Sequence, residues 1–347
     1  MFLNKLDENL NQIFKKNNVS GMSVAVTNQK ETIYQKGFGV LNAEYPCFLT
    51  VPESMYRIAS VTKITTGIMI MCLAQKGILN INEPIKNYIP WFNLDSNKAD
   101  EQITLKSLLS HTSGLPRGKI TEGSRDEFTL EQSLKQVLSE CTLSSLPSQK
   151  IYSYSNIGIS LAGLVASVVS GKTYSELVDD YVFKPLGMDF STFDFHVAST
   201  YSFSLPHCQD ENGNLKVEHY IRMNTMFRPS GGLYSNVTDL SKLARCILNR
   251  GKSDSGEQIL SAEFFEQMCT PYGKMPSDDD GEYGLTMRLF KYKNRYLYGH
   301  LGQSKPYATS VITDSKTGYG VVFLCNTDCY KLRTEIPYMI FDMLENQ

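Results

Sequence analysis

The strand-like segments of this chain lie near its two ends, and this separation constrains the fold more than any other feature. Residues 21–28 and 32–39 are two such segments joined by a short polar turn, a pattern that predicts a β-hairpin. Because an isolated hairpin is only marginally stable in water, these strands need partners from elsewhere in the chain. Further strand-like segments follow near the C-terminus, at residues 283–290, 295–301, 307–314 and 319–325. We therefore expect both ends of the chain to contribute strands to one sheet.

The long middle of the chain has a helical pattern. Apolar residues recur there at every third or fourth position, with Pro and Gly residues between the periodic segments. Helices are predicted at 64–76, 104–110, 130–139, 157–169 and 174–183, and later ones at 239–249, after Ser261 and at 331–345. The fold class is thus α/β (α+β). We expect an α/β domain made of residues 1–62 and 230–347, with a mostly helical domain of residues 63–229 inserted in it.

Length and charge narrow the class of protein. The 347 residues suffice for about two domains of ~150 residues each. The 34 Lys and Arg residues against 36 Asp and Glu give a net charge of −2, so there is no basic excess to bind nucleic acid, and none is expected as a partner. The eight cysteines have no paired spacing, which favours free thiols in a reducing compartment over a disulfide framework.

Targeting signals are not evident. The N-terminal segment has no uninterrupted apolar core of the kind a signal peptide needs. The most apolar segment, residues 67–79, is interrupted by polar residues and is too short to cross a bilayer. We expect a cytoplasmic protein with no membrane partner, unless a leader was removed before residue 1.

Two common types of site are disfavoured. The Gly-Lys-Thr and Gly-Lys-Ser segments at 171–173 and 251–253 lack the glycine that a phosphate-binding loop carries five residues earlier. His207, Cys208 and His219 flank a turn-forming segment, which predicts a surface hairpin and not a metal site. No metal or organic cofactor is expected.

Ser60 and Lys63 form the first candidate catalytic pair. In Ser60-Val61-Thr62-Lys63, a spacing of three places both side chains on one face of a helix. A serine hydroxyl becomes a good nucleophile when a neighbouring base takes its proton, and a lysine can act as that base only when it is neutral. The free N–H groups at a helix start can also stabilise an oxyanion.

Two further segments add chemistry. Tyr154-x-Asn156 precedes a helical segment and supplies a possible proton shuttle and an amide that can both donate and accept. A third element should be a cationic residue on a strand edge, for which Lys316-Thr317-Gly318 and His300-Leu301-Gly302 compete. Residues 314–320 have the composition of a hairpin turn, whereas His300 ends a strand. We therefore choose His300.

With these elements in this order, the chain resembles the serine β-lactamase-like hydrolases, in particular the branch of class C β-lactamases, D,D-peptidases, D-aminopeptidases and esterases. The resemblance covers residues 15–345 and includes segments 108–115, 183–188 and 231–236. It implies the β-lactamase/transpeptidase-like fold. In that fold an antiparallel sheet is flanked by helices, a mostly helical domain is inserted, and the active site lies between the two.

The resemblance also implies the roles of individual residues. Ser60 matches the acylated nucleophile, Lys63 its base and Tyr154 the proton shuttle. The oxyanion hole would consist of the backbone N–H groups of Ser60 and Gln303. His111 belongs to a family motif, but we expect it to be a structural residue at the end of a helix.

The same resemblance assigns substrate contacts to Asn156, His300 and Gly302. Much of the family has a threonine between the last two, where this chain has Leu301, which cannot donate a hydrogen bond to a substrate carboxylate. His300 is also only partly charged near neutral pH, where a lysine would be fully charged. Both changes weaken the case for β-lactams and for peptides that end in D-alanine.

The sequence therefore predicts a serine hydrolase that forms an acyl-enzyme at Ser60 with a small ester or amide, or a short peptide. Peptidase-like and esterase-like activities stay open. A β-lactamase is one alternative, and a penicillin-binding or sensor protein that is acylated without turnover is another. Specificity is expected in the loops at 115–127, 200–220 and 272–283, and the sequence leaves the oligomeric state open.

Overall fold

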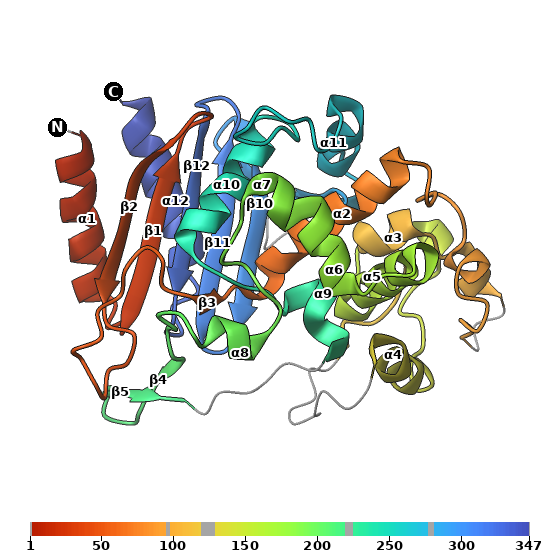
Figure 1. Ribbon diagram of the computed structural model, residues 1–347, viewed down its shortest axis with the longest axis horizontal. Helices are drawn as coiled ribbons and strands as arrows, with labels where there is room; N and C mark the ends of the chain where they lie inside the picture. The colour runs from red at the N-terminus through yellow and green to blue at the C-terminus, as the bar shows by residue number, and fades with distance from the viewer. Residues whose placement is uncertain (1, 95–97, 119–128, 219–224, 277–280, 347) are drawn as a thin grey trace.

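An antiparallel sheet of eight strands organises the computed structural model, which describes residues 2–94, 98–118, 129–218, 225–276 and 281–346. The strand order is β2-β1-β12-β11-β10-β9-β8-β7 (Figure 1). The strands are β1 (Gly21–Thr27), β2 (Thr32–Gly39), β7 (Gly273–Lys274), β8 (Gly281–Tyr283), β9 (Arg288–Tyr292), β10 (Arg295–Ser304), β11 (Tyr307–Asp314) and β12 (Tyr319–Cys325).

Strands from the two ends of the chain pair directly in this sheet. β1 lies between β2 and β12, and its register with β12 runs from Met22 opposite Cys325 to Thr27 opposite Gly320. Every residue of β1 is buried, as expected for a central strand covered on both faces. The prediction that distant strands share one sheet is confirmed.

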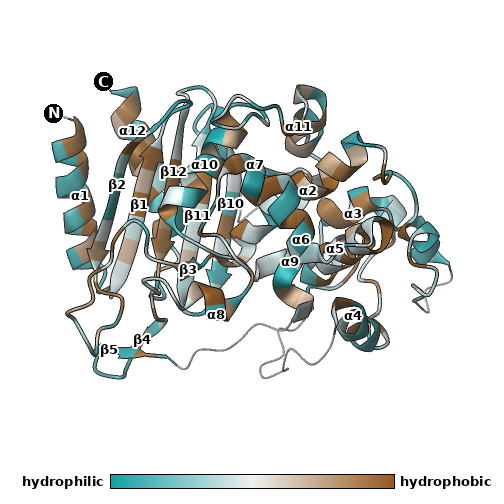
Figure 2. Cartoon of the chain, in the orientation of Figure 1, coloured by the Kyte–Doolittle hydropathy of each residue, from teal (hydrophilic) through white to brown (hydrophobic). Residues whose placement is uncertain are grey.

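Helices cover both faces of the sheet. On one face, α1 (Phe2–Lys16) and α12 (Leu332–Glu345) bury Leu6, Leu10, Ile336 and Ile340 against the strands. On the other face, α10 (Val237–Leu248) packs on β1, β11 and β12. Both chain ends therefore lie at the same side of the molecule in Figure 1. Figure 2 shows the alternation of brown and teal along α1 that this one-sided packing requires.

The remaining helices gather beside the sheet (Figure 1). They are α2 (Thr62–Gln75), α3 (Leu105–Leu109), α4 (Leu130–Leu138), α5 (Asn156–Ser170), α6 (Tyr174–Val178), α7 (Lys184–Leu186), α8 (Phe195–Ala198), α9 (Arg228–Gly231) and α11 (Ala262–Cys269). α5 begins where the Ser155 hydroxyl accepts the Gly158 N–H at 2.9 Å, and it ends at Gly171 in a left-handed conformation.

One apolar core joins the helical part to the sheet. It contains Ile68 of α2 and Leu161 of α5 together with Val311 and Leu324 of the sheet. The exact boundaries proposed above for the inserted domain, 62/63 and 229/230, stay a prediction.

Two predicted elements differ in the structure. The expected strand at 283–290 is divided into β8 and β9, because the chain turns between them and Thr286 takes a positive φ of 59°. The expected helix at 174–183 is α6 followed by a π-helical turn at Asp179–Phe183. Two small sheets were not predicted in full, β3 (Tyr56–Arg57) with β6 (Tyr234–Ser235) and β4 (His207–Gln209) with β5 (Leu215–Val217).

The predicted hairpin is present as β4 and β5, with His207 and Cys208 in β4, whereas His219 lies outside the described residues. The His207 ring is buried, and its Nε2 accepts the Ala43 N–H at 2.9 Å.

Within the described ranges, no single helix is long and apolar enough to cross a membrane. Residues 156–170 and 174–186 meet that criterion only as a pair, and they are bent by 87° to each other.

Candidate active site

Ser60 lies at the start of a helix, as predicted. It is the middle residue of a 3₁₀ turn at Ala59–Val61 that leads directly into α2, and Ala59 has a positive φ of 50°. A left-handed conformation is costly for a residue with a Cβ atom, so it marks a sharply constrained backbone at this point. The turn presents the half-buried Ser60 hydroxyl to two cavities.

Lys63 is fully buried one turn along from Ser60. Its Nζ donates to Asn156 Oδ1 at 2.9 Å and to the Ser230 carbonyl oxygen at 2.6 Å, and it lies 3.1 Å from Ser60 Oγ. These partners carry no formal charge. Burial, and less strongly the charge of Arg117, therefore hold the pKa of Lys63 well below its usual value. The site favours the neutral amine that a general base requires.

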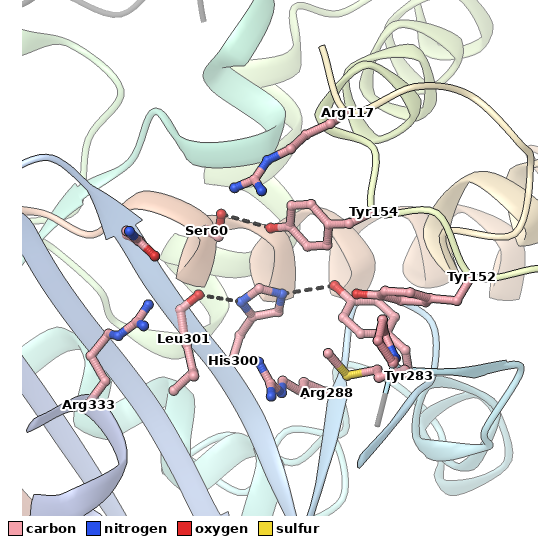
Figure 3. A pocket seen from close by; sticks show the side chains of 12 residues that line it. Ser60, Arg117, Tyr152, Tyr154, Tyr283, Arg288, His300, Leu301 and Arg333 are labelled. Atoms are coloured by element: carbon pink, nitrogen blue, oxygen red, sulfur yellow. Dashed lines mark hydrogen bonds between the residues drawn. The ribbon is translucent and has the colours of Figure 1, made fainter. Parts of the chain in front are cut away.

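Tyr154 contacts the same hydroxyl. Its OH donates to Ser60 Oγ at 2.9 Å (Figure 3). Burial raises the pKa of Tyr154 to about 12, so the phenol is protonated near neutral pH and can act as a donor. The Lys63 Nζ lies 4.8 Å from the centre of its ring.

The end of α3 and the start of α5 hold Tyr154 in place. His111 follows α3, as expected, and its buried ring lies 4.4 Å from the ring of Tyr154. His111 Nδ1 accepts the Ser155 N–H at 3.1 Å. The structure thus supports the structural role predicted for His111, with the more specific effect of supporting Tyr154 and the start of α5.

Strand β10 approaches the Ser60 turn closely because residue 302 is glycine. A Cβ atom there would lie 1.9 Å from Thr309 Oγ1 and 2.3 Å from the Ile58 carbonyl oxygen. Thr309 Oγ1 in turn donates to that Ile58 oxygen at 2.7 Å. Gln303, the next residue, lines both cavities with Ser60. The oxyanion-hole role of the Ser60 and Gln303 N–H groups stays a prediction.

His300 lines the larger cavity, but both of its ring nitrogens are engaged. Nδ1 donates to the Leu301 carbonyl oxygen at 2.7 Å, and Nε2 lies 2.9 Å from the Tyr283 hydroxyl (Figure 3). Burial holds the pKa of His300 well below its usual value. His300 is therefore a neutral group, and its direct contact with substrate stays a prediction.

The competing Lys316-Thr317-Gly318 segment is the turn between β11 and β12. Lys316 directs its side chain to solvent, 68% exposed, and its Nζ lies 3.7 Å from Glu345 on α12. The turn predicted for residues 314–320 is confirmed, and Lys316 does not line either cavity.

The two cavities meet at Ser60. The larger, of about 430 Å³, is lined by Ser60, Arg117, Tyr152, Tyr154, Met275, Pro276, Tyr283, Arg288, His300, Leu301, Gln303 and Arg333. The smaller, of about 280 Å³, is lined by Ala59, Ser60, Arg117, Gly118, Tyr154, Asn156, Phe227, Ser230, Gly231, Gln303 and Ser304. Of the three loops expected to set specificity, those at 115–127 and 272–283 contribute described residues, whereas the described part of 200–220 contributes none.

Sequence reasoning missed several of these residues. Ser230 acts through its carbonyl oxygen, and a backbone group gives no signal in the residue type. Tyr283 and Arg117 lie in loops or short strands without a motif, although Pro116 and Gly118 beside Arg117 mark a constrained loop.

Comparisons with known proteins place the chain in a family. The family model described as Beta-lactamase matches residues 6–340. The protein Flp of Staphylococcus aureus (strain MW2) is 25% identical over 335 residues, which are 93% of this chain and 62% of Flp. This chain thus spans less than two thirds of the length of that relative.

Two solved structures have the same fold. The octameric penicillin-binding protein homologue from Pyrococcus abyssi has a TM-score of 0.85 at 24% identity, over 100% of this chain and 78% of that one. The D-amino acid amidase from Ochrobactrum anthropi SV3, complexed with L-phenylalanine amide, has a TM-score of 0.84 at 20% identity over 99% of both chains. The β-lactamase/transpeptidase-like fold is confirmed, and with the family model covering nearly its whole length, the chain belongs to the beta-lactamase family.

Proposed function

We propose that this protein is a serine hydrolase that forms an acyl-enzyme at Ser60 with a small ester or amide. One observation carries the proposal. The Ser60 hydroxyl lies between the amine of a buried lysine, at 3.1 Å, and the hydroxyl of Tyr154, at 2.9 Å, where two cavities open. This arrangement provides a nucleophile, a base and a proton donor within reach of one reacting carbonyl group.

The hydrogen bonds of Lys63 favour the direction of proton transfer. A neutral amine has two N–H groups and one lone pair. The Asn156 Oδ1 and the Ser230 carbonyl oxygen can only accept, so they engage both N–H groups. The lone pair is then left for the hydroxyl proton of Ser60.

Acylation follows from these positions. Ser60 Oγ attacks the substrate carbonyl carbon while its proton moves to Lys63. The bond to the leaving group breaks as Tyr154 donates its proton to the departing oxygen or nitrogen, and Lys63 returns a proton to Tyr154. Water then attacks the acyl-enzyme by the same steps in reverse order, which releases the acid and restores Ser60.

The substrate bond is an ester or amide. The amidase with the same fold, complexed with an amino-acid amide, supports a small amide. Leu301 supplies no side-chain donor at the position where much of the family binds a carboxylate, which weakens the β-lactamase alternative.

Intact-protein mass spectrometry with a fluorophosphonate tests the nucleophile. We expect one covalent adduct that maps to Ser60, together with steady hydrolysis of a 4-nitrophenyl ester. Ser60→Ala should lose both while its circular dichroism is unchanged, because the hydroxyl caps no helix. Ser315→Ala, in the exposed turn after β11, is the matched control and should retain both.

The same reactions separate turnover from slow deacylation. A release of one equivalent of 4-nitrophenol per chain without a steady state would favour the sensor alternative. An adduct that persists in Ser60→Ala would place the nucleophile elsewhere and overturn the proposal.

A further inference from the structure

Arg117 contributes a cation at the junction of the two cavities. Its exposed side chain lines both of them, and in Figure 3 its guanidinium points toward the side of Ser60 and Tyr154. The guanidinium carbon lies 5.6 Å from the centre of the Tyr154 ring. A group bound at Ser60 would therefore lie next to this charge whichever cavity it occupied.

The backbone of this loop is fixed although the side chain is exposed. The Arg117 carbonyl oxygen accepts the Asn156 N–H at 3.1 Å, and the Pro116 carbonyl oxygen accepts the Ser155 hydroxyl at 2.7 Å. Both bonds connect the loop to the start of α5, the helix that places Asn156 beside Lys63. The guanidinium thus projects from an anchored position next to the reacting groups.

The charged side chains in the described lining of the two cavities are all positive. Arg288 and Arg333 also line the larger cavity, whereas no carboxylate belongs to the described lining of either cavity. The chain as a whole has a net charge of −2, so this excess of positive charge is a local property of the site. Such a site attracts an anionic group and raises its local concentration.

We propose that Arg117 selects esters and amides that carry a carboxylate, and that it binds this carboxylate on the Tyr154 side of Ser60. The proposal rests on the proposed hydrolase function and specifies its substrate class. Leu301 cannot bind a carboxylate along β10, and Arg117 provides a cation at a different wall of the site. An Arg–carboxylate contact is charge-assisted and can be bidentate, which gives it both strength and orientation.

Matched pairs of esters test this proposal. The first pair is 4-nitrophenyl hydrogen adipate and 4-nitrophenyl methyl adipate, in which a carboxylate on the acyl part is replaced by its neutral methyl ester. The second is 4-carboxyphenyl acetate and its methyl ester, which differ by a charge on the leaving group. We expect the native protein to have a kcat/KM about tenfold higher for the acid in at least one pair. This preference should fall as the salt concentration rises, because the Arg117 side chain is exposed and salt screens its charge.

Arg117→Gln should reduce that preference to about twofold or less. The acid and neutral esters are compared on the pH-independent plateau of each protein, because the charge of Arg117 also lowers the pKa of Lys63. Arg117→Lys should keep part of the preference. Arg250→Gln is the control, because Arg250 is exposed and pairs with Glu266 on the surface. Its preference should equal that of the native protein.

Three results would overturn the proposal. One is an equal kcat/KM for acid and neutral esters in the native protein, and another is an unchanged preference in Arg117→Gln. The third is a preference lost in Arg333→Gln but kept in Arg117→Gln, which would place the carboxylate along β10. In each case hydrolysis of the neutral esters would leave the hydrolase function standing, whereas no turnover of any ester would overturn both proposals.

Discussion

At the scale of single residues, Lys63 shows how burial determines the protonation state of a side chain. A lysine that faces a carboxylate would keep its charge, but this side chain meets a hydroxyl, an amide oxygen and a backbone carbonyl oxygen. Desolvation then disfavours the ammonium form, and the nearby charge of Arg117 acts in the same direction.

The pH dependence of hydrolysis should follow from this. Neutral Lys63 is the active form, so kcat/KM for a neutral ester should fall as the pH falls through its lowered pKa, well below 10.5. Loss of the Tyr154 proton is not expected before about pH 12. A rate profile with 4-nitrophenyl methyl adipate between about pH 5 and 10 measures the acid limb.

Arg117→Gln sharpens this test. Removing the positive charge should raise the pKa of Lys63, so the acid limb should move to higher pH. An acid limb near the ordinary lysine pKa in the native protein would mean that the site does not hold Lys63 neutral.

The motifs named residues that the folded chain brings together, but not their protonation states. Lys63 and Tyr154 lie within hydrogen-bonding distance of Ser60, and His300 lines the same cavity as Ser60, whereas their catalytic and binding roles stay a prediction. The neutral state of His300 follows from its burial, and its contact with Tyr283 joins β10 to β8, two strands that are not adjacent in the sheet. Contacts of this kind form only when the chain folds, so a motif carries no information about them.

At the scale of elements, the packing of α5 against α9 positions a partner of Lys63. Gly163 of α5 faces α9 so closely that a Cβ atom would lie 2.7 Å from the ring of Pro229. The next residue, Ser230, provides the carbonyl oxygen that Lys63 contacts. The distance between two helices therefore determines a hydrogen bond of the proposed catalytic base.

Two glycines of α5 provide a matched comparison. Gly163→Ala should destabilise the protein by about 1–3 kcal/mol, because the methyl group displaces Pro229 from a packed interface. It should also lower kcat/KM by moving the Ser230 oxygen. Gly158→Ala should be neutral or stabilising by up to about 1 kcal/mol, since its Cβ would meet its nearest neighbours only at 3.4 Å.

Urea unfolding and ester hydrolysis measure both effects. Equal stability of the two variants would show that α5 and α9 can separate without cost. A destabilised Gly163→Ala with native kcat/KM would show that the Ser230 contact tolerates the displacement.

The boundaries of helices and strands were predicted well where the local sequence determines them. They were predicted poorly where contacts with distant parts of the chain determine them. β11 and β12 have the predicted limits, and the turn between them has a clear composition. The break between β8 and β9 has a tertiary cause. There, the Thr286 N–H donates to the Leu109 carbonyl oxygen at 2.8 Å, which takes the chain out of the sheet.

At the scale of the whole molecule, the two parts share one core. Ile68 of α2 belongs to the same apolar cluster as sheet residues Val311 and Leu324. Ile340 of α12 packs in the cluster on the opposite face of the sheet. Since the sheet lies between the clusters, we expect the protein to unfold as one cooperative unit.

Ile68→Ala and Ile340→Ala test this expectation. Each should lower the free energy of unfolding by about 2–5 kcal/mol, because each side chain is fully buried. In both variants, far-UV circular dichroism and the fluorescence of Trp91, the single tryptophan, should report one common urea midpoint. If Ile340→Ala moved the dichroism midpoint and left the Trp91 midpoint unchanged, the parts would be independent.

The topology has a consequence for synthesis on the ribosome. Met22 pairs with Cys325, so roughly 300 residues must be translated before β1 meets β12. At about 5–20 residues per second, this takes on the order of 15–60 seconds. For that time the nascent chain carries an apolar strand with an open edge, which is the type of segment that aggregates or binds chaperones. The pairing that stabilises the finished sheet therefore makes β1 the strand that waits longest for its second partner.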